Sequence, residues 1–262
     1  MRKVYAILVI IMLICIGCQW QLKPNSDAAG KRQVSIQRYD RIESLYLTTG
    51  DYSALQQMNT NYPTQTRMLI EDMLQLGPVN APGINTRFLH SFQDSTLQNM
   101  LYDVQQQYAD LDDLNEEFTQ AFEKLALLLP SVTVPEIYTQ IGSFDQSIIV
   151  GNNMLGISLD KYLGRDYPFY QSHYTDEQRR LMVRSMIVPD AIAFYLLSLF
   201  PLPSARQVPA NRVRHMGRIQ WVVQQAVGRN VYDNAEVAAV EQLMKGNDST
   251  DVEQLLRWGD LP

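Results

Sequence analysis

The first eighteen residues limit what the rest of the chain can fold into. Met1-Arg2-Lys3 precede an unbroken apolar run over residues 4–16, which ends at Gly17-Cys18. A helix of that length would cover about 20 Å, well short of the roughly 30 Å hydrocarbon core of a bilayer. The pattern therefore predicts a signal peptide over residues 1–17 rather than a permanent membrane span. An uncleaved signal anchor and an ordinary secreted protein are the alternatives.

The end of that segment, Cys15-Ile16-Gly17-Cys18, resembles a lipobox, although Cys15 is an unusual residue at its position. In a lipobox the sulfur of the last cysteine receives a diacylglycerol, and cleavage then makes that cysteine the first residue. Two or more acyl chains, such as palmitate, hold a protein stably on a membrane, whereas one chain binds marginally. The sequence therefore predicts lipidation of Cys18 and a membrane-anchored lipoprotein of the cell envelope that faces the periplasm.

Cysteine content constrains the body of the protein. Cys15 and Cys18 are the only cysteines, so the mature body can form no disulfide and must be stabilised by its hydrophobic core. Residues 18–33 are polar and include Pro24 and Gly30, which is typical of a flexible, lipid-anchored tether. Residues 34–262 are predicted to form a single, mostly helical globular domain, which is long enough to bury a substantial core.

Charge is distributed unevenly along the chain. Cleavage removes Arg2 and Lys3 and leaves 20 basic against 28 acidic side chains, a net charge of −8 that disfavours nucleic acid as a partner. Residues 191–232 contain no Asp or Glu, whereas residues 103–123 contain seven. The acid-free stretch carries a basic patch of Arg206, Arg212, Arg214 and Arg218, followed by Arg229. We interpret the two stretches as pairing with each other; a patch that binds a partner or phospholipid is the alternative.

Apolar periodicity predicts a mainly α fold with a small antiparallel β-sheet, the α+β class. Leucines and phenylalanines at three- and four-residue steps predict a helix over residues 107–129, ended by Pro130. Short β-prone runs separated by Gly-Ser and Asn-Asn pairs predict three strands. The strands are expected at 136–141, 147–151 and 154–159, and further helices near Asp40 and at 97–108, 179–200 (capped by Thr175 and interrupted at Pro189), 210–227 and 234–244, with a last turn at 252–258.

Residue types that carry catalysis are sparse. His90, His173 and His215 stand far apart in sequence, and neither an HExxH motif nor a G-x-S-x-G motif is present. We therefore predict no catalytic residue, no metal ligand and no cofactor. The densest polar and aromatic cluster is LDKYLGRDYPFY at residues 159–170.

That cluster has two interpretations. In the first it is a structural corner, in which Asp160 and Asp166 cap turns, Gly164 has a positive φ and the aromatic rings cover the sheet. In the second it forms a binding cleft with a carboxylate from the following helix. The candidate cleft residues are Asp160, Tyr162, Asp166, Tyr170 and Asp190.

The same run carries a family resemblance. Together with the preceding hairpin, Tyr174, the stretch at 186–190 and Gln37-Arg38-Tyr39-Asp40, it resembles the gliding motility lipoprotein GldB family of Bacteroidetes. The resemblance extends from Cys18 to about Phe200 and weakens after it, as for a divergent and shorter member. It implies an envelope lipoprotein associated with gliding and its secretion machinery.

The hairpin followed by a helix also resembles zincin metallopeptidases. In that register Pro189 and Ala193 stand at the two zinc-ligand positions of HExxH and Asp190 stands at the general base. Neither Pro nor Ala can bind zinc, so this resemblance implies a degenerate zincin-like core that lacks the metal site.

The sequence is compatible with three functions. The preferred hypothesis is a non-enzymatic lipoprotein that binds an envelope protein partner or supports assembly of an envelope complex. The alternative is a small-ligand-binding or hydrolytic protein that uses the carboxylate and tyrosine cleft. A third possibility is docking on anionic headgroups through the arginines of residues 206–229.

Overall fold

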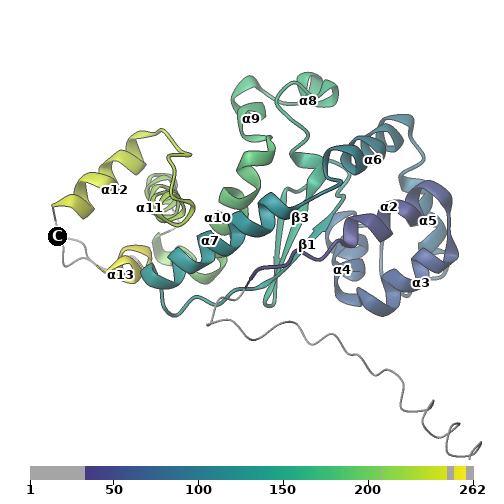
Figure 1. Ribbon diagram of the computed structural model, residues 1–262, viewed down its shortest axis with the longest axis horizontal. Helices are drawn as coiled ribbons and strands as arrows, with labels where there is room; N and C mark the ends of the chain where they lie inside the picture. Colours follow the sequence, from purple (N-terminus) through teal and green to yellow (C-terminus); the bar gives the residue numbers. More distant parts are fainter. Residues whose placement is uncertain (1–32, 207, 247–250, 258–262) are drawn as a thin grey trace, which may run out of the picture. The chain divides into compact units, whose positions relative to one another are not determined.

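Most of the described chain is helical, and the helices surround a small sheet (Figure 1). The computed structural model describes residues 33–206, 208–246 and 251–257. The signal peptide predicted for residues 1–17, the lipidation site Cys18, the tether up to residue 32 and Trp258 lie outside the described residues. The α+β class predicted from the sequence is confirmed.

The first helices form one block beside the sheet. Helix α2 buries Tyr39, Tyr46 and Leu47, and it ends at Gly50, whose φ of 69° few other residues adopt at low cost. Asp51 then caps the next helix by accepting a hydrogen bond from the backbone N–H of Ser53. The block consists of α2 (Tyr39–Thr49), α3 (Tyr52–Asn61), α4 (Pro63–Arg67), the π-helical η1 (Met68–Met73) and α5 (Ile84–Ser91).

Two longer helices follow, α6 (Ser95–Gln107) and α7 (Asp112–Leu128). Helix α7 buries its periodic apolar face and stops before Pro130, as predicted. Its start was predicted too early, at residue 107, because the chain leaves the helix at Tyr108. There the Tyr108 hydroxyl donates a hydrogen bond of 2.6 Å to the carbonyl oxygen of Tyr162. The Tyr108 side chain thus makes a tertiary contact at the point where α6 ends.

The sheet contains β1 (Glu136–Gln140), β2 (Ile148–Gly151) and β3 (Met154–Ser158), in the order β1-β3-β2. Strands β2 and β3 form the predicted antiparallel hairpin, which turns at Asn153 with φ 55°. The prediction of a purely antiparallel sheet is wrong, because β1 pairs with β3 in parallel. Strand β3 lies between β1 and β2, so β1 meets the strand that runs in its own direction. Hydrophobic pattern fixes which residues face the core but not this strand order.

Strand β3 is buried along most of its length, and one glycine fits it to its neighbour. Gly156 is paired with Tyr138 of β1, and a Cβ at Gly156 would lie 2.5 Å from the Tyr138 hydroxyl oxygen. The Tyr138 ring therefore occupies the space that a side chain at residue 156 would need. Backbone close approach of this kind is a common reason for glycine in a strand.

The C-terminal half returns to helices. Pro189 was expected to mark a kink or two meeting helices, and two helices are found. The chain breaks at Met182 and Val183, and Pro189 falls in the first turn of α10, where its missing N–H costs little. The remaining elements are η2 (Leu159–Lys161), α8 (Pro168–His173), α9 (Asp176–Leu181), η3 (Arg184–Met186), α10 (Ile187–Leu199), η4 (Ser204–Arg206), α11 (Pro209–Val227), α12 (Ala235–Lys245) and α13 (Val252–Leu256).

Candidate functional site

The five residues of the predicted cleft are divided by the structure into three environments. Asp160, Tyr162 and Tyr170 are buried, Asp166 is exposed, and Asp190 is half-buried in the first turn of α10. Tyr162 links two of these groups, because its hydroxyl donates a hydrogen bond of 3.0 Å to Oδ2 of Asp190. Asp166 is on the surface, and its backbone carbonyl accepts a hydrogen bond from Gln171.

Asp160 organises the loop that follows β1. Its Oδ1 accepts a hydrogen bond of 2.7 Å from the Gly142 backbone N–H, and its Oδ2 accepts one of 2.6 Å from that of Phe144. Burial raises the pKa of this carboxyl group, and the two backbone donors partly oppose the rise. Ser143 and Phe144 have φ values of 55° and 62°, which non-glycine residues rarely adopt. Asp160 thus stabilises a loop whose backbone is in a rarely adopted conformation.

Phe144 is held from several directions. The Tyr174 hydroxyl and the Lys161 ammonium donate hydrogen bonds to its carbonyl oxygen, at 3.0 and 3.1 Å. The Tyr170 hydroxyl donates to the Asp160 carbonyl oxygen, and its ring meets the Phe144 ring edge-on. The residues that stood out in the sequence therefore position Phe144.

Two further buried carboxyl groups hold the end of β1. Asp40 forms a two-point ion pair with Arg38 and accepts a hydrogen bond from the Thr139 hydroxyl. Glu43 accepts one of 2.9 Å from the Ile141 backbone N–H, and burial raises its pKa well above the usual range. Among the described residues no group of three or more His, Cys, Asp and Glu could hold a metal ion.

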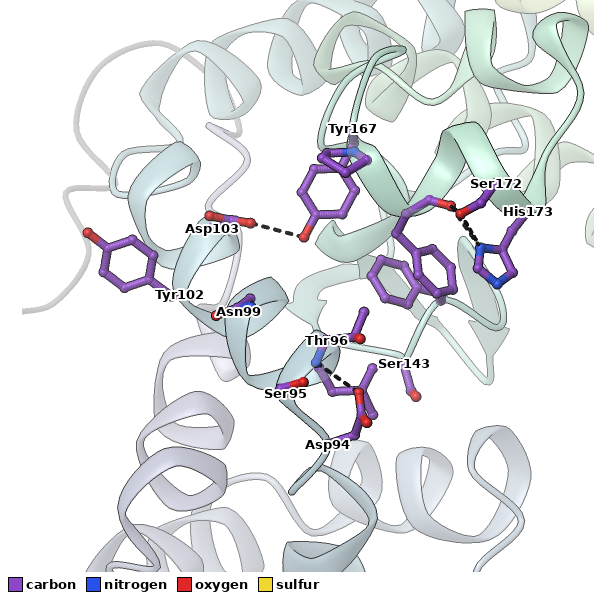
Figure 2. A pocket seen from close by; sticks show the side chains of 14 residues that line it. Asp94, Ser95, Thr96, Asn99, Tyr102, Asp103, Ser143, Tyr167, Ser172 and His173 are labelled. Carbon is purple, nitrogen blue, oxygen red and sulfur yellow. Dashed lines mark hydrogen bonds between the residues drawn. The ribbon is translucent and has the colours of Figure 1, made fainter.

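Next to Phe144 lies an open cleft of about 840 Å³ (Figure 2). The N-terminal half of α6 forms one wall, α8 and Tyr167 form the other, and Ser143 and Phe144 lie between them. The Tyr167 hydroxyl donates a hydrogen bond of 3.0 Å to Oδ2 of Asp103, which joins the two walls. The lining residues are Asp94, Ser95, Thr96, Leu97, Asn99, Tyr102, Asp103, Ser143, Phe144, Tyr167, Pro168, Phe169, Ser172 and His173.

Aromatic rings form one side of this cleft. Phe144 stacks on Phe169 with ring centroids 3.9 Å apart, and Phe169 stacks on His173 at 4.0 Å. On the opposite wall Tyr102 is 62% exposed, a high value for so large an aromatic side chain. Both faces of Phe169 are therefore covered by neighbouring rings, and the exposed ring of Tyr102 is available for stacking with an occupant.

The charge of the cleft is negative. Asp94 and Asp103 line it, and the lining residues of this described cavity include no Lys or Arg. Asp94 caps α6 by accepting a hydrogen bond from the Thr96 backbone N–H, and that bond lowers the pKa of its carboxyl group. Ring faces beside carboxylates suit a cationic or planar group, such as a lysine or arginine side chain.

Asp190 has the chemistry of a proton-transfer group. Burial raises the pKa of its carboxyl to about 7, and the hydrogen bond from the Tyr162 hydroxyl partly opposes the rise. A carboxyl group with a pKa near neutrality can donate and accept protons. Pro189 and Ala193, which occupy the zinc-ligand positions of the zincin register, are buried on the same helix.

The four arginines of the predicted basic patch lie at one end of the C-terminal helices. Arg206 ends η4, and Arg212, Arg214 and Arg218 lie in the first half of α11. The predicted pairing with the acidic stretch occurs at Arg229, which forms an ion pair of 2.9 Å with Glu117 of α7. Within the described part of the chain, Arg212 and Arg214 form no such ion pair.

Comparison with models of known protein families gives a match. The family model described as "Gliding motility protein GldB" matches residues 20–237. The match extends past Phe200, where the resemblance read from the sequence weakens. Searches of curated proteins and of solved structures found no match. No helix in the described residues has the length and apolar character needed to cross a membrane.

Proposed function

The chain belongs to the family of the gliding motility protein GldB, and from this membership we propose that it is a cell-envelope lipoprotein that binds a protein partner. In this proposal a lipid on Cys18 anchors the chain, the body faces the periplasm, and the body catalyses no reaction. The N-terminal sequence supports the anchor, because a basic segment, a short apolar run and Gly17-Cys18 follow one another in the order that lipoprotein processing requires.

The cleft between α6 and α8 is the observation that best supports partner binding. Its floor is rigid, because Asp160, Lys161 and Tyr174 all hold the backbone of Phe144. A preorganised surface loses little entropy when a partner binds. The exposed Tyr102 and the stacked Phe169 provide the kind of aromatic area that dominates binding energy in protein interfaces.

Charge specifies the occupant of the cleft. Since Asp94 and Asp103 line it and no lysine or arginine is among the lining residues of the described cavity, an acidic segment would be repelled. A segment of the partner that presents a lysine or arginine next to apolar residues would pair with these carboxylates and stack on the rings. We assign the cleft to such a segment of an envelope protein.

Capture from solubilised envelope membranes tests this proposal. The full-length, tagged wild-type protein should enrich one or a few envelope proteins above a Cys18→Ala control. Tyr102→Ala removes an exposed ring from the cleft, and Asp103→Asn removes a charge but keeps an acceptor for the Tyr167 hydroxyl. Each should weaken capture about tenfold, which is typical of a residue central to an interface.

A matched control separates the cleft from the surface in general. Tyr52 on α3 is 74% exposed and does not line the cleft, so Tyr52→Ala should capture the same proteins as the wild type. Equal capture by Tyr52→Ala, Tyr102→Ala and Asp103→Asn would exclude the cleft as the binding site. A wild-type bait that recovers no envelope protein above membranes without tagged protein would refute partner binding itself.

A small-ligand-binding or hydrolytic protein is the second candidate function, and the pKa of Asp190 near 7 favours it. Two observations argue against the carboxylate cluster as a reaction centre. Both carboxylate oxygens of Asp160 accept backbone hydrogen bonds, and Asp166 lies on the surface. If this candidate is correct, hydrolysis of some substrate will depend on an ionisation near pH 7 and will be lost in Asp190→Asn.

A further inference from the structure

The first two turns of α11 present arginines and apolar side chains together. Val208 is 52% exposed, Val213 is 55% exposed and Met216 is 36% exposed. Val213 and Met216 are neighbours on the helix surface, and Met216 also follows Arg212 by one turn. We name this the arginine surface and define it by Arg206, Val208, Arg212, Val213, Arg214 and Met216.

Helix stability does not explain these arginines. The N-terminal end of a helix carries a partial positive charge, so acidic residues stabilise it and basic residues do not. The first turn of α11 contains no acidic residue. Arg212 and Arg214 are exposed and form no ion pair within the described ranges. Among the described residues, therefore, no contact in the fold accounts for the positive charge of Arg212 and Arg214.

Arg218 lies close enough to Arg206 and Arg214 for their positive charges to act on its guanidinium group. Burial lowers the pKa of Arg218 first, and the charges of Arg206 and Arg214 lower it further. The Arg218 side chain also donates a hydrogen bond to the carbonyl oxygen of Leu255 on α13. On that helix Glu253 pairs with Arg257, so its negative charge is already compensated. Glu236 of α12 packs against Gly217 of α11, but the exposed Arg212 and Arg214 form no ion pair among the described residues, so the exposed charge of this surface is positive.

Positive charge mixed with apolar side chains is the composition that binds the interface of an anionic bilayer. We propose that the arginine surface docks on the anionic phospholipid headgroups of the membrane that holds the lipid anchor. In the docked state Arg212 and Arg214 contact phosphate groups, and Val213 and Met216 enter the boundary between headgroups and acyl chains. This inference rests on the proposed anchor at Cys18.

The length of the N-terminal segment permits this docking. Residues 18–32 precede the described body and could extend over about 50 Å, at up to about 3.6 Å per residue. In the proposed lipoprotein a segment of this length is long enough for the arginine surface to reach the bilayer. The anchor keeps the arginine surface at high local concentration near the headgroups, so a weak attraction is sufficient.

Hydrogen exchange on the anchored full-length protein tests the inference. The chain is inserted through its lipid into vesicles of phosphatidylcholine alone or of phosphatidylcholine with phosphatidylglycerol. Backbone amides of residues 208–216 should exchange more slowly on the vesicles that contain phosphatidylglycerol, whereas those of α3 should be unchanged. High salt should remove the difference, because the screening length falls to about 3 Å at 1 M.

Two double variants with the same change in net charge provide the comparison. Arg212→Gln/Arg214→Gln should reduce the docking equilibrium by about 30-fold, which corresponds to about 1 kcal/mol for each arginine at an anionic surface. Arg67→Gln/Arg180→Gln removes two exposed arginines from α4 and α9 and should leave protection intact. Val213→Ser should weaken docking, unlike Leu127→Ser at a side chain that is 83% exposed on α7.

The outcomes distinguish failure of docking from failure of the anchor. An anchored chain whose residues 208–216 exchange at the same rate on both vesicles overturns the docking inference alone. Equal loss of protection in the two double variants overturns it as well, because the attraction would then depend only on net charge. A chain that carries no lipid and leaves the vesicles contradicts the proposed function instead.

Discussion

Asp190→Asn should make the protein more stable than the wild type at neutral pH. This gain in stability should disappear as the solution becomes acidic. The Asp190 carboxyl group is half-buried and accepts a hydrogen bond of 3.0 Å from the Tyr162 hydroxyl. Its pKa is raised to about 7 because burial disfavours the charged form. Asparagine cannot ionise, but its amide oxygen can still accept the hydrogen bond from Tyr162.

The size of the effect follows from the shift in pKa. In the unfolded chain an aspartate has a pKa of about 3.9, so the shift is about three units, or about 4 kcal/mol at most. The folded state binds the proton more tightly than the unfolded state. The stabilisation that the protonated Asp190 carboxyl group provides is therefore fully present below about pH 4. It is lost as the pH rises to about 7. Above that range the wild-type protein carries the full cost of a buried charge.

Chemical unfolding of wild-type and Asp190→Asn proteins between pH 4 and pH 8 measures this directly. The difference in free energy of unfolding should shift in favour of the variant by up to about 4 kcal/mol across that range. Asp166→Asn provides the control, since its exposed side chain should change stability by less than about 0.5 kcal/mol at every pH. A difference between wild type and Asp190→Asn that does not vary with pH would refute the account of a buried, partly protonated carboxyl group.

Three further changes test the fold around the cleft, each measured by urea unfolding. Asp160→Ala leaves the backbone N–H groups of Gly142 and Phe144 unpaired, so we expect a loss of about 3 kcal/mol or more; a loss below about 1 kcal/mol would show that water replaces the carboxylate. Gly156→Ala places a methyl group 2.5 Å from the Tyr138 hydroxyl oxygen and should cost about 1–3 kcal/mol, whereas an unchanged midpoint would contradict the packing. Thr175→Ala removes the capping box of α9 and should cost about 1 kcal/mol, with Thr175→Ser retaining most of that stability.

Local signals in the sequence predicted the elements that depend on nearby residues. The apolar face of α7 and its end before Pro130, the hairpin of β2 and β3, and the cap at Thr175 each arise within a few residues. The strand order does not, because β1 pairs with β3 rather than with β2. The loop between β1 and β2 is held by Asp160, which is 16 residues beyond Phe144 in sequence. Contacts between residues so far apart in sequence leave no periodic pattern of apolar residues.

The sequence likewise indicated only part of the cleft. The run at residues 159–170 was recognisable as unusual, but its buried members Asp160 and Tyr170 position Phe144 and do not line the cleft. The opposite wall is not marked by apolar periodicity, because Tyr102 and Asp103 lie away from the buried face of α6. Tyr102 lies outside the three- and four-residue steps of that face and precedes Asp103. An aromatic residue on the polar side of a helix, next to a carboxylate, was the available signal.

Mass spectrometry of the mature N-terminus tests the central claim most directly. Protein purified from membranes should lack residues 1–17 and begin at Cys18, with a diacylglycerol on its sulfur. Cys18→Ala should carry no such lipid and should keep its first seventeen residues. A wild-type chain that begins at Met1, or one that is cleaved but carries no acyl chain, would contradict the lipoprotein account and the membrane docking that depends on it.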